Sequence, residues 1–170
     1  SILGYYKPMS TKKALHAGWI IPVRPKGQIL EKHTLVIEDQ KIKSILPTED
    51  WKRRKKSRNM EELDLNSCAL IPGFVNTHTH SPMSLLRGVA EDLPFDEWLK
   101  NHIWPLEGAF VNKEFVRDGT ELSIAEMLLS GTTCFNDMYF FGDETARISI
   151  ETGIRACIGM IVIKFPSKWA

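Results

Sequence analysis

The sequence has few cysteines, little net charge and no long apolar segment. Its three cysteines are scattered and form no CxxC pair, which argues against a disulfide scaffold and favours a reducing, cytoplasmic compartment. The formal net charge is only +1, so bulk charge indicates neither a nucleic-acid nor a membrane partner. No stretch approaches the ~18 apolar residues of a membrane helix, and the N-terminus shows no signal-peptide pattern. What remains is a chain of 170 residues with ordinary globular composition, 43% hydrophobic and 25% charged.

One local cluster of positive charge interrupts this balance. Residues 52–58 read KRRKKSR. We expect a solvated loop or helix face here, because charge runs usually face water. A basic docking patch is the alternative.

The first third of the chain has the pattern of β structure. Residues 14–23 form an apolar run, and residues 34–38 and 41–46 are short strand-like runs separated by Asp39 and Gln40. Two such runs joined by two residues predict a hairpin. Residues 47–62 are polar and are expected to be helical or loop, and residues 63–70 return to a strand pattern.

After Pro72 the pattern changes to alternating strands and helices. We predict strands at 74–80, 132–141 and 155–163, the last of them buried on both faces. Asn112 is expected to cap a helix that ends near Gly131, and Asp143 to cap a helix over 144–152 that stops at Gly153. Strands that alternate with helices indicate βαβ units and a parallel sheet. Three strands are too few for a closed barrel, so the chain is expected to be the front of a longer protein.

The end of the first of these strands carries two histidines, His78 and His80. Side chains two residues apart on a strand face the same way, so the two imidazoles can converge on one metal ion. By itself an HxH pair is a weak signal, because one histidine can be a core residue and the other exposed. Delivery of both by an apolar strand that is entered through Pro72 and Gly73 favours half of a divalent-metal site.

The surrounding blocks resemble a known family. They are PGFVNTHTH at 72–80, LLRGVAED at 85–92, FDEWL at 95–99, PLE at 105–107 and DMY at 137–139. Together they resemble the amidohydrolase superfamily, and most closely its cytosine-deaminase-like branch. That branch includes chlorohydrolases and deaminases of methylthioadenosine and S-adenosylhomocysteine.

This resemblance implies the fold class and the cofactor. The expected fold is α/β, with residues 70–170 forming the first three strands of a (β/α)₈ TIM barrel. Residues 1–69 would form part of a small composite β-sandwich domain. The resemblance also implies one divalent metal, Zn²⁺ or Fe²⁺, with His78 and His80 as two of its ligands and the remaining ligands and acid/base residue beyond Ala170.

The resemblance further implies the reaction and a substrate contact. The full-length protein is expected to be an aminohydrolase that deaminates adenosine-type nucleosides such as 5-methylthioadenosine and S-adenosylhomocysteine, through hydroxide generated at the metal. Glu107 is expected to bind the ribose hydroxyls, since a carboxylate accepts two hydrogen bonds from a vicinal diol. Related deaminases can carry an arginine near the end of the third strand, but residues 158–162 read IGMIV. This departure leaves the substrate open.

Other residues have weaker patterns. For Trp98 and Trp104, core packing is favoured over a place in the wall of the site. Arg87 and Asp137 are expected to make supporting or structural hydrogen bonds rather than to act in catalysis. The other three histidines show no partner pattern and are interpreted as non-ligands; they are His16, His33 and His102.

Two alternatives to nucleoside deamination follow. Within the superfamily, the substrate would be guanine, cytosine or a chlorinated triazine. In a different class, the 170 residues would be an inactive truncated fragment or a non-catalytic partner. The open edge of a three-stranded sheet would then favour association, including homo-oligomerisation.

Overall fold

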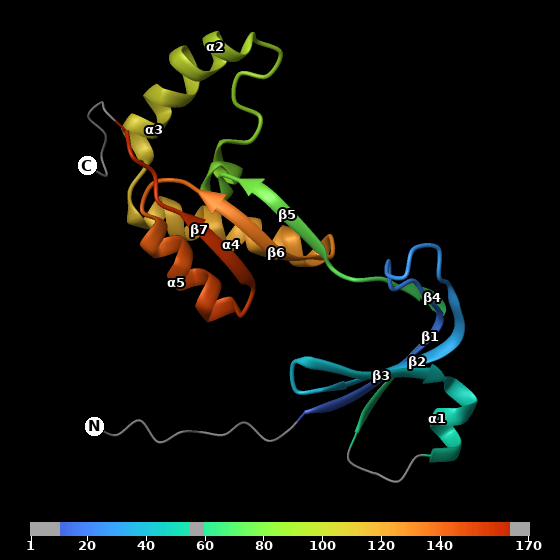
Figure 1. Ribbon diagram of the computed structural model, residues 1–170. Helices are drawn as coiled ribbons and strands as arrows, with labels where there is room; N and C mark the ends of the chain where they lie inside the picture. The colour runs from blue at the N-terminus through green and yellow to red at the C-terminus, as the bar shows by residue number, and fades with distance from the viewer. Residues whose placement is uncertain (1–10, 55–59, 164–170) are drawn as a thin grey trace, which may run out of the picture. The chain divides into compact units, whose positions relative to one another are not determined.

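The computed structural model describes residues 11–54 and 60–163. The chain divides into two units, Ser1–Pro72 and Gly73–Ala170, which are considered separately (Figure 1). No helix in the described ranges is both long and apolar enough to cross a membrane.

The first unit is built on a four-stranded sheet with strand order β3-β2-β1-β4. Its elements are β1 (Lys12–Ile20), β2 (Leu30–Glu38), β3 (Lys41–Pro47), α1 (Thr48–Arg54) and β4 (Glu61–Leu70). β2 and β3 pair antiparallel on either side of Asp39 and Gln40, so the predicted hairpin is confirmed. β1 runs antiparallel to β2 and parallel to β4. Ala17, Ile20 and Leu35 form the buried core of this unit.

The basic run begins on α1. Lys52 and Arg53 are exposed there and pair with Glu49 and Asp50 one turn earlier. This part of the run is therefore a solvated helix face, as expected. Residues 55–59, which hold the rest of the run, lie outside the described residues.

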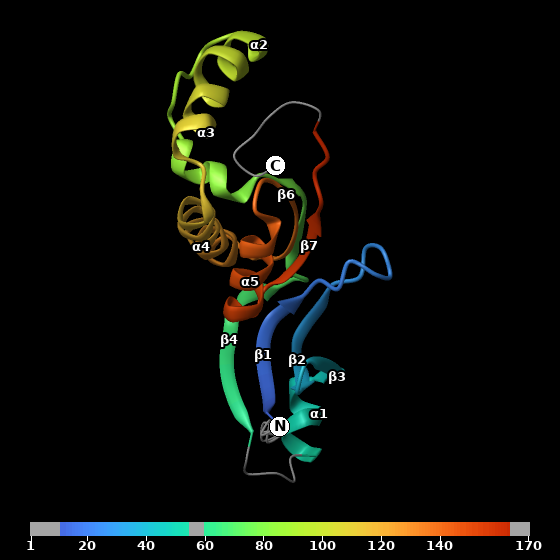
Figure 2. The same ribbon diagram turned by 90° about the vertical axis from the view of Figure 1, so that its left-hand side faces the viewer.

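The second unit contains a three-stranded parallel sheet of order β5-β6-β7. Its strands are β5 (Phe74–Thr79), β6 (Thr132–Met138) and β7 (Arg155–Gly159), joined by α4 (Lys113–Leu129) and α5 (Gly142–Thr152). The predicted β-α-β-α-β order is therefore confirmed. α4 and α5 lie against one face of the sheet (Figures 1 and 2). The apolar core there consists of Ile124, Met127, Phe135, Ile148 and Ile154.

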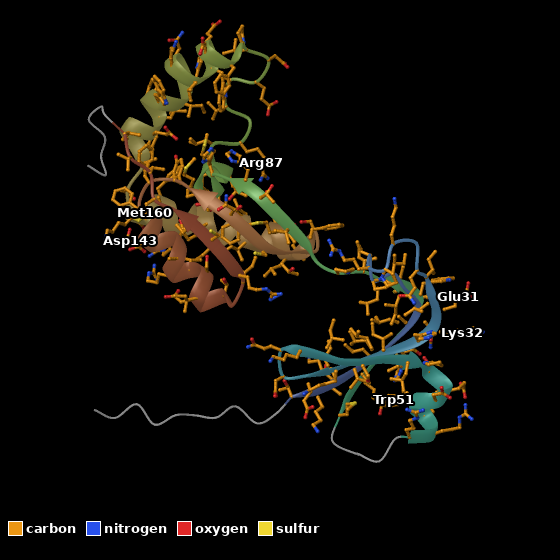
Figure 3. All side chains as sticks on the ribbon, viewed as in Figure 1. Glu31, Lys32, Trp51, Arg87, Asp143 and Met160 are labelled. Atoms are coloured by element: carbon orange, nitrogen blue, oxygen red, sulfur yellow. The ribbon has the colours of Figure 1, made fainter. Side chains whose placement is uncertain are left out.

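Local signals set most of the helix ends correctly. The Asn112 side chain accepts a hydrogen bond of 2.9 Å from the Phe115 N–H and caps α4. Gly153 ends α5 with a φ of 76°, a conformation that glycine adopts without strain. The predicted cap at Asp143 is wrong, because α5 begins at Gly142 after Phe141, whose φ is 50°. Asp143 lies in the first turn (Figure 3) and pairs instead with Lys113 at 3.5 Å.

The prediction for the third strand is wrong in extent and burial. β7 ends at Gly159, and its first three residues are exposed. A parallel strand is buried on both faces only when both faces are covered. β7 pairs with β6 and packs against α5, and it forms an edge of the described sheet.

Residues 81–110 continue past the carboxyl end of β5 (Figure 1). They form the 3₁₀ turn η1 (Ser81–Leu86), the short helix α2 (Phe95–Glu97), the π-helical segment η2 (Trp98–Ile103) and α3 (Trp104–Phe110). η1 packs tightly on α4 at Gly119, where an added Cβ would lie 2.5 Å from the Pro82 carbonyl oxygen. Glycine at 119 therefore allows α4 to hold the turn that follows His80.

Candidate metal and substrate site

The two histidines of the HxH motif meet at the end of β5. His78 lies in the strand, and His80 directly precedes η1. Their ring centroids are 4.9 Å apart, with an angle of 82° between the ring planes. The structure thus brings together the pair that the sequence singled out, and both rings line the same cavity.

A backbone carbonyl fixes the orientation of the His80 ring. Nδ1 of His80 lies within hydrogen-bond distance of the Met138 carbonyl oxygen at the end of β6. A carbonyl only accepts, so Nδ1 is the donor, and in the neutral ring the lone pair is on Nε2. Metal-binding histidines are typically held in this way by an acceptor at the other ring nitrogen.

The described contact of the His78 ring is the edge-on packing against the His80 ring. Among the described residues no hydrogen bond to its imidazole is found, and its backbone N–H donates to Asn76 Oδ1 at 3.2 Å. Two converging imidazoles, one with its lone pair directed by a carbonyl, form a donor set that fits Zn²⁺ or Fe²⁺. No cluster of three or more His, Cys, Asp or Glu side chains suited to a metal occurs in residues 11–54 and 60–163. Within these ranges the candidate donor set therefore consists of the two imidazoles.

Asp137 holds the end of β5, where the two histidines lie, against β6. Its side chain is fully buried at the carboxyl end of β6. Oδ1 accepts hydrogen bonds from the Thr79 hydroxyl at 2.6 Å and from the Ser81 N–H at 2.7 Å. Thr79 lies between the two histidines and Ser81 follows the second, so one carboxylate ties both sides of His80 to β6. This is the supporting role expected for Asp137.

A cavity of about 720 Å³ opens beside the histidines. Its size is within the range of about 300–1,000 Å³ that is typical of small-molecule sites. The polar groups on its wall are His78, His80, Glu107 and the Tyr139 hydroxyl, and the rest of the wall is mainly apolar. Apolar wall residues include Met83, Phe95, Trp98, Leu99, Trp104 and Val111. The arrangement suits a largely apolar ligand with a few polar contacts.

Glu107 comes to this cavity from α3, far from the histidines in sequence. The Tyr139 hydroxyl donates a hydrogen bond of 2.8 Å to Glu107 Oε1. Burial raises the pKa of Glu107 above its usual value, although the hydrogen bond from Tyr139 acts to lower it. Burial and the nearby Glu107 carboxylate raise the pKa of Tyr139 far above its ordinary value. Tyr139 is consequently a permanent donor to Glu107.

The preference for core packing of Trp98 and Trp104 is wrong. Both line the cavity, and Trp104 is 43% exposed. The Trp98 indole N–H donates to the Val89 carbonyl at 3.3 Å, and its ring lies 5.9 Å from that of Phe95. The reason is topological: residues 95–110 form helices beyond the strand ends, so their aromatic side chains cover the site instead of the sheet.

Arg87 makes the structural contact that was expected. It lies past the carboxyl end of β5 (Figure 3) and forms two hydrogen bonds, of 2.9 and 2.6 Å, with Glu126 on α4. The Arg87 side chain is largely exposed and that of Glu126 is partly exposed, and neither lines the cavity, so this pair contributes to the docking of residues 81–87 on α4.

The other three histidines are not among the residues that line this cavity. His16 has partners that the sequence did not reveal: Nδ1 lies 2.9 Å from Thr34 Oγ1 and Nε2 lies 3.3 Å from Glu62 Oε2. Its ring also packs edge-on against Trp51 on α1 (Figure 3). His33 Nδ1 donates to the Glu31 carbonyl at 2.6 Å, and His102 lies on η2.

Sequence reasoning missed the role of the end of β6. Met138 supplies its carbonyl to His80, and Tyr139 supplies its hydroxyl to Glu107. The available signal was position: the end of a parallel strand next to the strand that carries the histidines lies at the same edge of the sheet. After β7, Ile161 and Ile163 line the cavity, and residues 158–162 contain no arginine.

Comparison with known proteins gives consistent similarities. A sequence model of the amidohydrolase family matches residues 69–168. The chain is 49% identical over 153 residues to a 5-methylthioadenosine/S-adenosylhomocysteine deaminase of Saccharophagus degradans, covering 90% of this chain and 34% of that protein. It is 57% identical over 103 residues to a 5′-deoxyadenosine deaminase of Methanococcus maripaludis, covering 59% of this chain and 24% of that protein.

A solved structure shares both fold and sequence. The crystal structure of an adenosine deaminase from Xanthomonas campestris, with bound zinc, superimposes with a TM-score of 0.90 at 45% identity. The match covers 94% of this chain and 36% of that one. The chain thus spans about a third of the length of the relatives it matches.

Proposed function

The chain belongs to the amidohydrolase family, and from this premise we propose that the full-length protein is a metal-dependent aminohydrolase of adenosine-type nucleosides. Methylthioadenosine and S-adenosylhomocysteine are the proposed substrates. The observation that carries the proposal is one cavity that holds the His78–His80 pair and Glu107 on an otherwise mainly apolar wall. The deaminase names of relatives at 43–49% identity support it.

We propose that His78 and His80 hold one Zn²⁺ or Fe²⁺ together with ligands from the remainder of the full-length protein. When bound, such an ion lowers the pKa of water toward ~7 and supplies the nucleophile for hydrolysis at neutral pH. The Met138 carbonyl keeps His80 Nε2 available to bind the metal, and Asp137 holds Thr79 and Ser81 on either side of His80.

Glu107 is the proposed anchor for the ribose. Its carboxylate accepts hydrogen bonds from the vicinal hydroxyls, and this orients the purine so that its amino-bearing carbon faces the histidines. The apolar wall excludes water from the rest of the nucleoside. Phe95, Trp98 and Leu99 offer apolar surface to the purine ring or to the thioether part of the 5′ substituent.

The proposed architecture extends beyond the described sheet. We infer that residues 70–170 are the start of a (β/α)₈ barrel and residues 1–69 part of a small β-sandwich domain. A sheet of three parallel strands with both helices on one face fits the first part of such a barrel. A cytoplasmic location and homo-oligomerisation are proposed with it.

Ammonia release by the purified, zinc-loaded full-length protein tests the function. We expect turnover of 5-methylthioadenosine, S-adenosylhomocysteine or 5′-deoxyadenosine, and loss of at least about 100-fold in His78→Ala and His80→Ala variants, since two metal ligands are removed in turn. His33→Ala, which changes a histidine in the other unit, is the control and keeps full activity. Zinc-loaded protein that releases no ammonia from any adenosine-type nucleoside would refute the proposal. Activity restricted to a free base or a triazine, unaffected by Glu107→Ala, would replace it.

A further inference from the structure

Tyr139 occupies a defined place between the metal-site histidines and Glu107. It follows β6 directly, and only 5% of its surface is exposed. Its ring packs with Val111 and Val116 and contacts the Phe140 ring edge-on at 5.1 Å. The core therefore fixes the direction of the hydroxyl.

The Tyr139 hydroxyl donates its hydrogen bond to Glu107, which has a flexible side chain. A glutamate has three rotatable side-chain bonds, and ordering it costs more conformational entropy than ordering most side chains. Glu107 is only half-buried and comes from the short helix α3, yet its Oε1 lies 2.8 Å from the Tyr139 oxygen. In the described part of the chain, Oε2 has no hydrogen-bond partner. One carboxylate oxygen is thus anchored, and the other is left for a ligand.

The same bond also acts on the charge of Glu107. Burial raises the pKa of the Glu107 carboxyl, whereas the hydrogen bond from Tyr139 lowers it. The hydroxyl therefore favours the ionised carboxylate, which is the form that only accepts hydrogen bonds. Binding of a diol, which donates two hydrogens, requires that form.

We propose that Tyr139 is a positioning residue for substrate: it holds the Glu107 carboxylate in the orientation that receives the vicinal hydroxyls of the ribose. This inference rests on the proposed function, because it assumes that Glu107 binds the ribose. A role for Tyr139 in packing alone is the competing explanation. The two differ in what removal of the hydroxyl does to substrate binding.

Tyr139→Phe in the zinc-loaded full-length protein separates them, because it deletes the hydroxyl and keeps the ring. We expect KM for the adenosine-type ribonucleoside to rise about tenfold, which corresponds to one lost hydrogen bond to a charged group, with kcat within about twofold. The acid limb of the kcat/KM profile moves to higher pH, because the interaction that lowers the pKa of Glu107 is gone. Thr152→Val, which deletes a distant hydroxyl on α5, leaves all three quantities unchanged.

A double-mutant cycle shows whether the effect passes through Glu107. In a Glu107→Gln background, Tyr139→Phe should change KM by less than about twofold, because the carboxylate to be positioned is already lost. The effect should also disappear with 2′,3′-dideoxyadenosine as substrate. If Tyr139→Phe does not fold, replacement by 3-fluorotyrosine, which makes the phenol a stronger donor, should shift the acid limb to lower pH.

The outcomes distinguish this inference from the proposed function. Wild-type protein that releases no ammonia from adenosine-type nucleosides overturns both. A wild type that deaminates them, combined with an unchanged KM and acid limb in Tyr139→Phe, overturns the role of Tyr139 alone. The role of Tyr139 is also overturned if Tyr139→Phe raises KM equally in the wild-type and Glu107→Gln backgrounds. An acid limb that does not shift in the fluorotyrosine protein overturns it as well.

Discussion

Asp137→Asn removes the negative charge of the carboxylate that holds the residues on either side of His80, and it keeps the size and shape of the side chain. The buried carboxylate accepts two short hydrogen bonds through Oδ1, from Thr79 and Ser81. An asparagine carbonyl can accept the same two bonds, but without the negative charge. The other oxygen, Oδ2, is buried without a hydrogen-bond partner among the described residues, so an amide group there gains no described acceptor.

The size of the effect follows from these contacts. A hydrogen bond to a charged group contributes about 1.5–3 kcal/mol, and a neutral one about 0.5–1.5 kcal/mol. Neutralising the shared acceptor of two bonds should lower the free energy of unfolding by about 2–3 kcal/mol. Because Thr79 and Ser81 flank His80, the ligand geometry loosens as well. Changes to residues that orient metal ligands typically lower metal affinity about 10- to 100-fold.

Two measurements on the full-length protein test this prediction. Denaturant unfolding gives the stability, and competition with a chromophoric chelator gives the zinc Kd. Asp143→Asn, a surface carboxylate of the same type on α5, is the control and should leave the zinc Kd unchanged. If Asp137→Asn lowers stability but keeps the wild-type zinc Kd within about twofold, Asp137 supports the fold without orienting the ligands. That result would refute the claim that Asp137 orients the two histidines for metal binding.

Three further predictions concern Gly119, Glu107 and the isolated chain. Gly119→Ala should lower the free energy of unfolding by about 1–3 kcal/mol or more, because the new Cβ would clash with the Pro82 backbone. The control Gly108→Ala, whose new Cβ meets no atom within 4 Å, should be neutral or stabilising by up to about 1 kcal/mol. Equal effects of the two variants in denaturant unfolding would contradict this prediction. Because burial raises the Glu107 pKa, its ionisation destabilises the folded state above that pKa, so Glu107→Gln should raise stability at neutral pH, with the gain shrinking as pH falls through the Glu107 pKa. A pH-independent difference would argue against it. The isolated 170-residue chain should bind zinc weakly and release no ammonia, and turnover by it would contradict the need for further ligands.

The order of strands and helices in the second unit and several of its helix ends could be predicted from the sequence. Asn112 and Gly153 marked helix ends because capping depends on one or two residues and their backbone conformation. Asp143 was misinterpreted because a carboxylate is favourable both at a cap and in the first turn. At that end Phe141 has a positive φ and the helix starts two residues earlier than expected.

The long-range contacts were beyond the reach of pattern reasoning. The histidine pair could be predicted because its two residues lie two positions apart at the end of one strand. The bond from Tyr139 to Glu107 joins residues 32 positions apart, and it depends on how α3 returns to the end of β6. The exposure of β7 and the places of Trp98 and Trp104 in the cavity wall likewise depend on which elements cover which face.

The most direct test of the account is the position of the metal. Crystals of the zinc-loaded full-length protein, measured on both sides of the zinc absorption edge, would locate the ion by its anomalous scattering. The account predicts one peak about 2.0–2.1 Å from ring nitrogens of both His78 and His80, with His80 bound through Nε2 because its Nδ1 donates to the Met138 carbonyl. A zinc ion bound elsewhere, or coordination through His80 Nδ1, would contradict it.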